Sequence, residues 1–293
     1  MRGILLRGVG GFYYALDEQG TVQTLRAQGK LRREHQKPKV GDVVEMTPGN
    51  DDEHGWILSI APRRNQLTRP PVANIDVIVV VVAAATPDPD LLLADRLLVT
   101  ARRAGIDVQL VVNKRDLAPE TAERICRQYA GAGVDPIALS AAAGGEDVAR
   151  LRQALAGRTH ALAGQSGAGK STLINALYGF QRETGELSHR IERGRNTTRH
   201  AELIPLPEGG MVLDTPGFSL LEGEVFDPVE LKECWPEFAP YEGRCFFQPC
   251  YHDREPRCPV IEAAANGEID PERHARYRDL LSELKTEWRN RYD

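Results

Sequence analysis

The stretch GQSGAGKST at residues 164–172 has the residue types and spacing of a phosphate-binding loop. Its glycines let backbone N–H groups point at phosphate oxygens, and the positive end of the following helix adds to the attraction. Lys170 would reach the β- and γ-phosphates, and Ser171 would hold Mg²⁺. An incidental glycine-rich turn is the alternative, but a strand-like run precedes the loop and a helix-like run follows it. The predicted phosphate ligands are Gly164, Gln165, Ser166, Gly167, Ala168, Gly169, Lys170, Ser171 and Thr172.

A second element would select the base. Asn113, Lys114, Arg115 and Asp116 have the form N-K-x-D of the guanine-reading loop, after the apolar run VQLVVN. A carboxylate at Asp116 can accept both the N1–H and the N2 amino hydrogens of guanine, whereas adenine offers no such donor pair. Polar sites of this kind reject the wrong ligand by roughly 10⁴-fold. Asn113 would brace the loops and the Lys114 stem would cover the base, so we predict GTP and GDP as ligands.

Two shorter motifs complete the predicted site. ALSA contains Ser140 and Ala141 and supplies a second guanine loop, in which the Ala141 N–H would meet guanine O6. DTPG at 214–217 follows an apolar run; Asp214 would contact Mg²⁺ through water, and the Gly217 N–H would sense the γ-phosphate. Alone, D-x-x-G is equally well explained by a strand that ends in a Pro-Gly turn. Its weight comes from the phosphate loop on the same chain.

The order of these motifs is rotated relative to the usual GTPase order. The guanine loop comes first, followed by the second guanine loop, the phosphate loop and DTPG. A parallel sheet tolerates such a cut when the old termini lie close together and the new ones open at a surface loop. The new break falls directly after DTPG, so the C-terminal part of the chain is tied to the segment that responds to the γ-phosphate.

Strand-like and helix-like runs alternate between residues 72 and 224, which indicates a parallel α/β sheet. The run VIVVVVAAA at 77–85 suits a buried parallel strand and is too short to span a bilayer. The predicted strands are 75–84, 108–113, 134–141 and 160–164, and the predicted helices are 89–105, 119–131, 146–155 and 170–179.

Residues 1–68 show short β-like runs broken by turn residues and no long helical period. They predict a small antiparallel barrel of the OB type, although the sequence alone does not separate it from an SH3-like barrel. Loops on OB barrels commonly bind nucleic acid. Trp56 is interpreted as a barrel core residue in preference to a platform for stacking nucleobases.

The net charge of −5 hides an asymmetry. Residues 1–69 hold 11 Lys and Arg against 8 Asp and Glu, or +3, which leaves −8 for the remainder. Basic residues gather at 29–42 and 189–200, where they contact phosphates or form solvated loops. The N-terminus lacks the features of a signal peptide, and the five cysteines do not resemble a secreted disulfide framework. We therefore expect a cytoplasmic protein with no membrane partner.

The C-terminal part, 225–293, carries a metal-binding pattern. Cys245, Cys250, His252 and Cys258 form C-x4-C-x-H-x5-C. Three thiolates and one imidazole make a closed tetrahedral Zn²⁺ set, which is structural rather than catalytic. A module this small needs the metal to fold. The stripe at helical spacing near the C-terminus is interpreted as packing: Tyr277, Leu280, Leu281, Leu284 and Trp288.

The motif order and the cysteine pattern together resemble the circularly permuted GTPases of the RsgA (YjeQ/YloQ) family over essentially the whole chain. The resemblance implies an N-terminal OB-like barrel at 1–68, a permuted P-loop α/β GTPase domain at 72–224 and a mostly helical zinc-binding module at 225–293. It implies one structural Zn²⁺, Mg²⁺ with GTP, and binding to the small (30S) ribosomal subunit and its rRNA. Weak hydrolysis, stimulated by the subunit, would accompany late subunit maturation; we also expect a monomer.

The residues that drive hydrolysis are less defined. Many GTPases place a glutamine directly after D-x-x-G to orient the attacking water, and this chain has Phe218 there. The family commonly carries a histidine before the threonine pair of switch I, where this chain has Asn196; His200 lies nearby. Thr197 or Thr198 would close over Mg²⁺ and the γ-phosphate. The predicted catalytic residues are Lys170, Thr197, Thr198, Asn196 and His200, and the predicted Mg²⁺ ligands are Ser171, Thr198 and Asp214.

The sequence thus predicts a nucleotide-controlled release switch on the small subunit, in which GTP orders the protein for RNA binding and hydrolysis releases it. Two alternatives stay open. One is a GTPase that acts away from the ribosome. The other is an RNA-binding module that uses GTP as a structural ligand, which Phe218 and Asn196 make conceivable.

Overall fold

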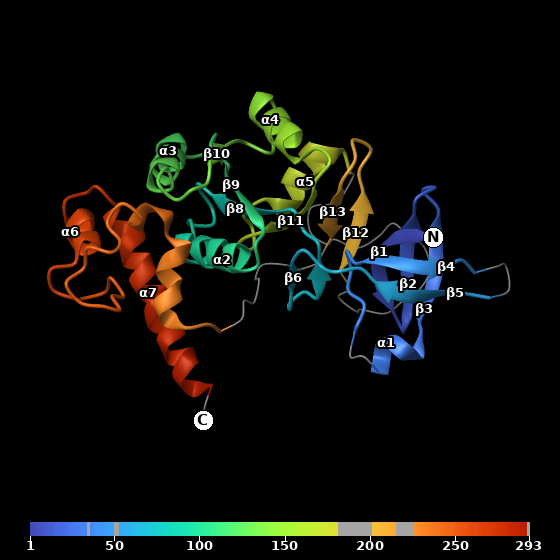
Figure 1. The fold of residues 1–293 in the computed structure, drawn as a ribbon. Coiled ribbons are helices and arrows are strands. Elements are labelled where there is room, and N and C mark those ends of the chain that lie inside the picture. Colours follow the sequence, from blue (N-terminus) through green and yellow to red (C-terminus); the bar gives the residue numbers. More distant parts are fainter. Residues whose placement is uncertain (34–35, 50–52, 181–200, 215–224, 292–293) are drawn as a thin grey trace.

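The computed structural model describes residues 1–33, 36–49, 53–180, 201–214 and 225–291. Figure 1 shows a β-barrel at one end of the molecule, a sheet flanked by helices in the middle, and a helical C-terminal part at the other end. None of the helices in the described part of the chain is long and apolar enough to cross a membrane.

The N-terminal part is a closed barrel with strand order β1-β2-β3-β5-β4. β3 and β5 pair in parallel and the other neighbours pair antiparallel, as in a Greek-key barrel of the OB type, so the choice between OB and SH3-like is resolved. The barrel core includes Leu5, Leu25, Val44, Met46 and Ile57. The elements are β1 (Arg2–Val9), β2 (Phe12–Asp17), β3 (Val22–Ala27), α1 (Gly29–Arg33), β4 (Val43–Thr47) and β5 (Gly55–Ile60).

The interpretation of Trp56 as a core residue is wrong. Gly55 and Ile57 are buried, and because side chains alternate along a strand, Trp56 between them points to the outside of β5. Its side chain is 42% exposed. The size and apolar character of tryptophan favour the core, whereas the two-residue period of the strand places Trp56 on the surface.

The central sheet has the order β10-β9-β8-β11-β13-β12. All neighbours pair in parallel except β12 with β13. The expected strand 134–141 is reduced to two residues in β10. The strands are β8 (Val77–Ala83), β9 (Asp107–Asn113), β10 (Ile137–Ala138), β11 (Thr159–Ala163), β12 (Glu202–Pro205) and β13 (Met211–Asp214). The helices are α2 (Leu91–Arg103), α3 (Pro119–Gln128), α4 (Glu146–Leu155) and α5 (Lys170–Tyr178), and a small hairpin of β6 (Gln66–Leu67) and β7 (Val72–Ala73) precedes the sheet.

The parallel strands explain how motifs far apart in the sequence meet. Every residue of β8 is buried, which accounts for its unbroken apolar sequence. The carboxyl ends of β8, β9, β10, β11 and β13 lie at one edge of the sheet because these strands share a direction. Ligands of open α/β sheets bind at that edge.

The C-terminal part is built from short helices and one long one. Its elements are η1 (Pro228–Cys234), η2 (Pro236–Phe238), α6 (Pro259–Ala265) and α7 (Pro271–Asn290). Tyr277, Leu280, Leu281 and Leu284 of α7 are buried, which confirms the packing interpretation of that stripe, and Trp288 is half-buried. α7 packs against α2 of the sheet part (Figure 1).

A buried ionic cluster joins α7 to α2. Asp95 of α2 is fully buried and accepts hydrogen bonds from Arg273, and from Arg276 at 2.6 Å. Arg273 also pairs with Glu237, and its guanidinium lies 4.6 Å from the Tyr129 ring centroid. The Asp95 and Glu237 charges keep the pKa of Arg273 raised even though burial acts to lower it. Arg273 and Arg276 therefore share the one Asp95 carboxylate, while Arg276 Nη2 and Glu237 Oε2 are buried and find no hydrogen-bond partner in the described part of the chain.

We expect Asp95→Ala to lower the free energy of unfolding by about 3 kcal/mol or more. The substitution removes the carboxylate that Arg273 and Arg276 share and leaves their buried charges without it. Arg96→Ala is the matched control on the same helix: it removes an exposed pair with Glu283, whose side chains are 40% and 44% exposed, and should cost less than about 1 kcal/mol. Urea denaturation followed by circular dichroism measures both. Equal small losses in the two variants would contradict the role given to the cluster.

Candidate nucleotide-binding and metal sites

The phosphate loop connects β11 to α5 and has the backbone that its glycines predict. Gly164 and Gly169 have φ of +137° and +94°. A Cβ at Gly164 would lie less than 3.0 Å from the Val81 carbonyl oxygen, and one at Gly169 less than 3.0 Å from the Asn113 amide nitrogen. Both positions therefore require glycine, for conformation and for space.

Lys170 begins α5 and folds back onto the loop. Its Nζ donates to the carbonyl oxygens of Gly164 at 2.6 Å and Gln165 at 2.9 Å. Burial lowers the pKa of Lys170. An anionic ligand beside this ammonium would offset the cost of burying its charge.

Asn113 ties the guanine-reading motif to two other loops. It ends β9, is 2% exposed, and its amide Nδ2 donates to the Ala168 carbonyl of the phosphate loop at 2.9 Å. Its Oδ1 accepts from the Ala141 N–H at 2.9 Å. One side chain thus sets the distance between the phosphate loop and the ALSA loop, which is the bracing predicted from the sequence.

Lys114 and Arg115 also act on the neighbouring loops. Lys114 has φ of +63°, and its Nζ donates to the Gly167 carbonyl at 2.8 Å and to the Thr86 carbonyl. The N–H of Arg115 donates to the Leu139 carbonyl at 3.1 Å. The Arg115 side chain donates to the Ala138 carbonyl at 3.0 Å and pairs with Asp147 at 2.8 Å. Arg115 occupies the variable position x of N-K-x-D, so the motif alone does not predict that its side chain holds the ALSA loop and α4 in place.

The groups expected to face the guanine differ in their surroundings. Asp116 is exposed, and the described residues give its carboxylate no hydrogen bond or ion pair. Ser140 and Ala141 are buried. The Ala141 N–H already donates to Asn113, so its contact with guanine O6 stays a prediction that requires this hydrogen bond to be exchanged or shared.

The turn at 86–90 is a part of the site that sequence reasoning missed. Gln165 of the phosphate loop accepts from the Asp90 N–H at 2.9 Å and donates to the Asp88 carbonyl at 2.9 Å. Asp90 also caps α2 by accepting from the Leu93 N–H. The available signal was the position of TPDPD directly after β8, whose carboxyl end lies at the same sheet edge as the phosphate loop.

Asp214 ends β13 at that edge and is half-buried opposite Glu202 of β12. Burial raises the pKa of Glu202; the nearby Arg7 guanidinium of the barrel opposes the shift, and the Asp214 charge adds to it. Ser171 and Thr172 are half-buried in the first turn of α5. The predicted residues Asn196, Thr197, Thr198, His200 and Gly217, with Phe218, lie outside the described residues.

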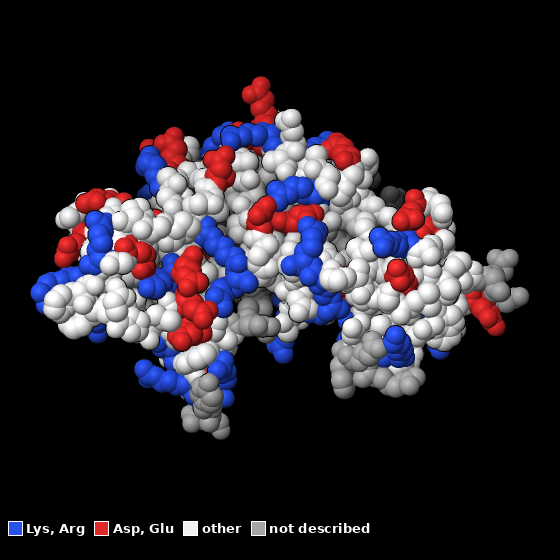
Figure 2. All heavy atoms as spheres, viewed as in Figure 1, with Lys and Arg blue, Asp and Glu red and all other residues white. Residues whose placement is uncertain are grey.

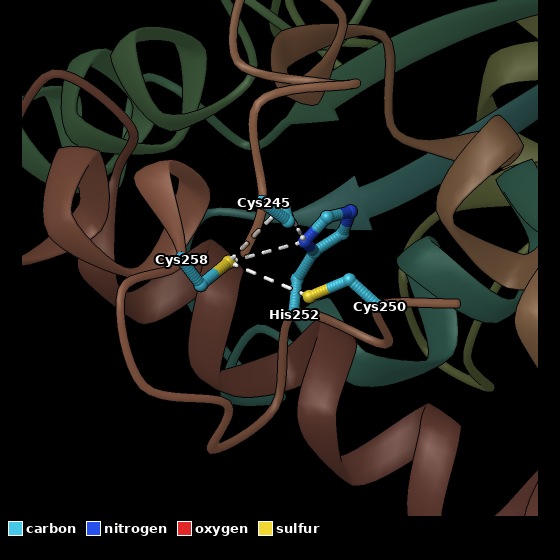
Figure 3. A group of neighbouring side chains, drawn as sticks. All are labelled: Cys245, Cys250, His252 and Cys258. Carbon is cyan, nitrogen blue, oxygen red and sulfur yellow. Dashed lines mark hydrogen bonds between the residues drawn. The ribbon is translucent and has the colours of Figure 1, made fainter. Parts of the chain in front are cut away.

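The four predicted metal ligands converge in the C-terminal part (Figure 3). The ligand atoms of Cys245, Cys250, His252 and Cys258 all lie within 4.8 Å of one another. Cys258 Sγ is 3.9 Å from Cys245 Sγ, 3.8 Å from Cys250 Sγ and 3.2 Å from His252 Nδ1. Tetrahedral ligands with metal–sulfur bonds of about 2.3 Å place two sulfurs about 3.8 Å apart. The group is therefore able to hold one metal ion.

Residues around the ligands support that use. His252 Nε2 lies 2.6 Å from a Glu242 oxygen, which fixes Nδ1 as the nitrogen that faces the thiols. Lys232 Nζ lies 3.2 Å from the other Glu242 oxygen. Burial raises the pKa of Cys250 to about 12, so its thiolate needs a nearby positive charge such as a metal ion. Glu242, 10 residues before His252, was not predicted from the sequence.

The sheet order and the loops at its carboxyl edge define a P-loop GTPase domain whose motifs appear in rotated order. Comparison with family models agrees: the RsgA GTPase model matches residues 60–224, and the RsgA N-terminal domain model matches residues 2–57. The chain belongs to the RsgA family of GTPases, as the resemblance of its motifs implied.

Curated relatives and solved structures match over nearly the whole chain. Small ribosomal subunit biogenesis GTPase RsgA of Ruminiclostridium cellulolyticum is 43% identical, covering 97% of this chain and 93% of the relative. The protein of that name from Agathobacter rectalis is 39% identical, covering 97% and 98%. The crystal structure of YjeQ from Thermotoga maritima has a TM-score of 0.80 and 35% identity, covering 97% and 98%. YloQ, described as a circularly permuted GTPase, has a TM-score of 0.78 and 32% identity, covering 98% and 95%.

We expect one metal ion per chain when the purified protein is analysed by plasma mass spectrometry, and we expect a strong chelator to lower its melting temperature. Glu242→Gln should weaken metal binding by about 10- to 100-fold without changing the stoichiometry, because Glu242 orients His252. Glu268→Gln is the control, since among the described residues the Glu268 carboxylate accepts a hydrogen bond from the Tyr241 hydroxyl and none from a metal ligand. The metal site would be contradicted if the chelator left the melting temperature unchanged and the two variants bound metal with equal affinity.

Proposed function

We propose that this GTPase binds the small ribosomal subunit and its rRNA during late maturation and that GTP hydrolysis to GDP and phosphate releases it. The relatives that match over the whole chain are named as small ribosomal subunit biogenesis GTPases. The observation that carries the guanine-nucleotide part of the proposal is the pair of hydrogen bonds made by Asn113, which hold the guanine-reading motif against the phosphate loop.

In the proposed nucleotide complex, Asp116 reads guanine and the 164–172 backbone holds the phosphates. Lys170, kept at the loop by two carbonyl oxygens, stabilises negative charge on the phosphates during transfer. Ser171, Thr198 and Asp214 would hold Mg²⁺, which supplies charge neutralisation between the β- and γ-phosphates. Gly217 would meet the γ-phosphate.

Water positioning is assigned to the switch I segment. Asn196 or His200 would orient the attacking water, since the position after DTPG is Phe218. Thr197 shares with Thr198 the role of closing over the nucleotide. Binding to rRNA phosphates by the arginines of 189–200 would order this segment, which explains why the subunit would stimulate turnover.

The proposed division of labour is a barrel at 1–68 for RNA, a GTPase domain at 72–224 and a zinc-binding domain at 225–293. The barrel contacts the sheet beside Asp214: the Arg7 guanidinium is 3.7 Å from the carboxylate of Glu202 in β12, and Glu202 lies opposite Asp214 of β13. Three cysteines and a histidine favour Zn²⁺ as the metal. We propose that the protein acts as a monomer in the cytoplasm, where small subunits mature.

GTP turnover with and without purified small subunits, at two salt concentrations, tests this function. We expect the subunits to raise turnover by at least about tenfold and the stimulation to fall at higher salt, because RNA phosphate contacts release counterions. Lys170→Ala should abolish turnover in both conditions. Turnover of wild-type protein that does not respond to subunits, with no subunit binding in sedimentation, would favour a GTPase that acts away from the ribosome.

A further inference from the structure

An aromatic and cationic row crosses the outer face of the barrel. Phe12 of β2 lies opposite Arg26 of β3, and Arg26 lies opposite Trp56 of β5. The Arg26 guanidinium sits 4.3 Å from the Phe12 ring centroid. His54 closes the group, with ring centroids 5.7 Å from Phe12 and 5.2 Å from Trp56. Residues up to 44 positions apart in the sequence, from Phe12 to Trp56, thus bring three aromatic rings and one guanidinium together on the surface.

A hollow of about 360 Å³ opens beside this row. That volume lies near the lower end of the range of roughly 300–1,000 Å³ for small-molecule pockets. The turn between β1 and β2, formed by Gly10 and Gly11, borders it, and a Cβ at either glycine would have no atom within 4 Å. The lining residues are Gly10, Gly11, Arg26, Ala27, Gly29 and Trp56.

The row is not needed to complete the barrel core, which is formed by other, fully buried residues. A single exposed tryptophan needs no partner, but a contiguous group of exposed and half-buried aromatic side chains indicates a binding surface. Figure 2 shows basic and acidic side chains interspersed on the face in view. The positive charge placed within the row itself is the Arg26 guanidinium. An aromatic face next to an arginine suits a nucleobase with its phosphate, since bases of any sequence stack on such rings.

We propose that Trp56, with His54 and Phe12, stacks an unpaired base of single-stranded RNA, and that Arg26 binds the adjoining phosphate. This inference rests on the proposed rRNA partner and names the form of RNA that the barrel takes: an extruded or single-stranded base rather than a duplex. The open glycine turn lets the RNA backbone approach the barrel closely.

Binding of a labelled 12-nucleotide single-stranded RNA, measured by fluorescence anisotropy with the full-length protein, tests the proposal. Trp56→Ala should weaken binding by about tenfold or more, whereas Trp56→Phe should retain most of the affinity because the ring is kept. Val22→Ala is the matched control, since Val22 is 52% exposed on the far end of β3. A blunt-ended RNA duplex of two separate strands, which has no unpaired bases, should bind all four proteins alike. Melting curves establish that each variant is folded.

Equal single-strand binding by wild type and Trp56→Ala would overturn the proposal, whatever the subunit assay shows. If Trp56→Ala impaired subunit stimulation but left single-strand binding intact, the row would contact a ribosomal protein, and the RNA proposal would be wrong. Absence of stimulation in the wild type would instead defeat the ribosomal function, while the oligonucleotide assay would still decide the role of Trp56.

Discussion

Asn113 makes the two hydrogen bonds on which the nucleotide site depends. Its amide joins the carbonyl of Ala168 to the N–H of Ala141, so the base-reading and phosphate-binding loops keep one separation. Because Asn113 is buried, loss of either bond would leave a buried polar group unsatisfied. Gly169 lies so close to this amide that only a residue without a side chain fits.

The rotated motif order has a mechanical consequence. The phosphate loop is linked through Gln165 to Asp90 at the start of α2. The same helix carries Asp95, which holds α7 of the metal-binding part through Arg273 and Arg276. On the other side, Arg7 of the barrel meets Glu202 of β12, opposite Asp214. Both flanking parts thus contact elements that begin or end at the nucleotide site, which gives a physical route by which nucleotide state and the proposed RNA binding can influence each other.

The sequence predicts those parts of the fold and the site that are defined by residues close together along the chain. The phosphate loop, the guanine motif and the four metal ligands could be predicted because their spacing alone constrains the chemistry. The strands around them could be predicted because β8 and the second half of β9 are buried apolar runs. The type of residue at Trp56 predicts a core position, whereas the strand period, with Gly55 and Ile57 buried on either side, puts it outside. The roles of Glu242, Gln165 and Arg115 depend on loops that meet only after folding, as does the junction of Asp95 with Arg273, 178 residues away. No spacing rule covers such pairs.

The central claim is that NKRD and the phosphate loop form one guanine-nucleotide site. It is tested most directly by asking which purine nucleotide the Asp116→Asn variant binds. The measurement is calorimetric binding of GTP and xanthosine triphosphate to the wild type, the variant and Asp135→Asn, an exposed-carboxylate control. Exchange of the carboxylate for an amide should weaken GTP binding by at least about a hundredfold and favour xanthosine triphosphate, while the control behaves as wild type. Unchanged GTP affinity in Asp116→Asn would contradict the account.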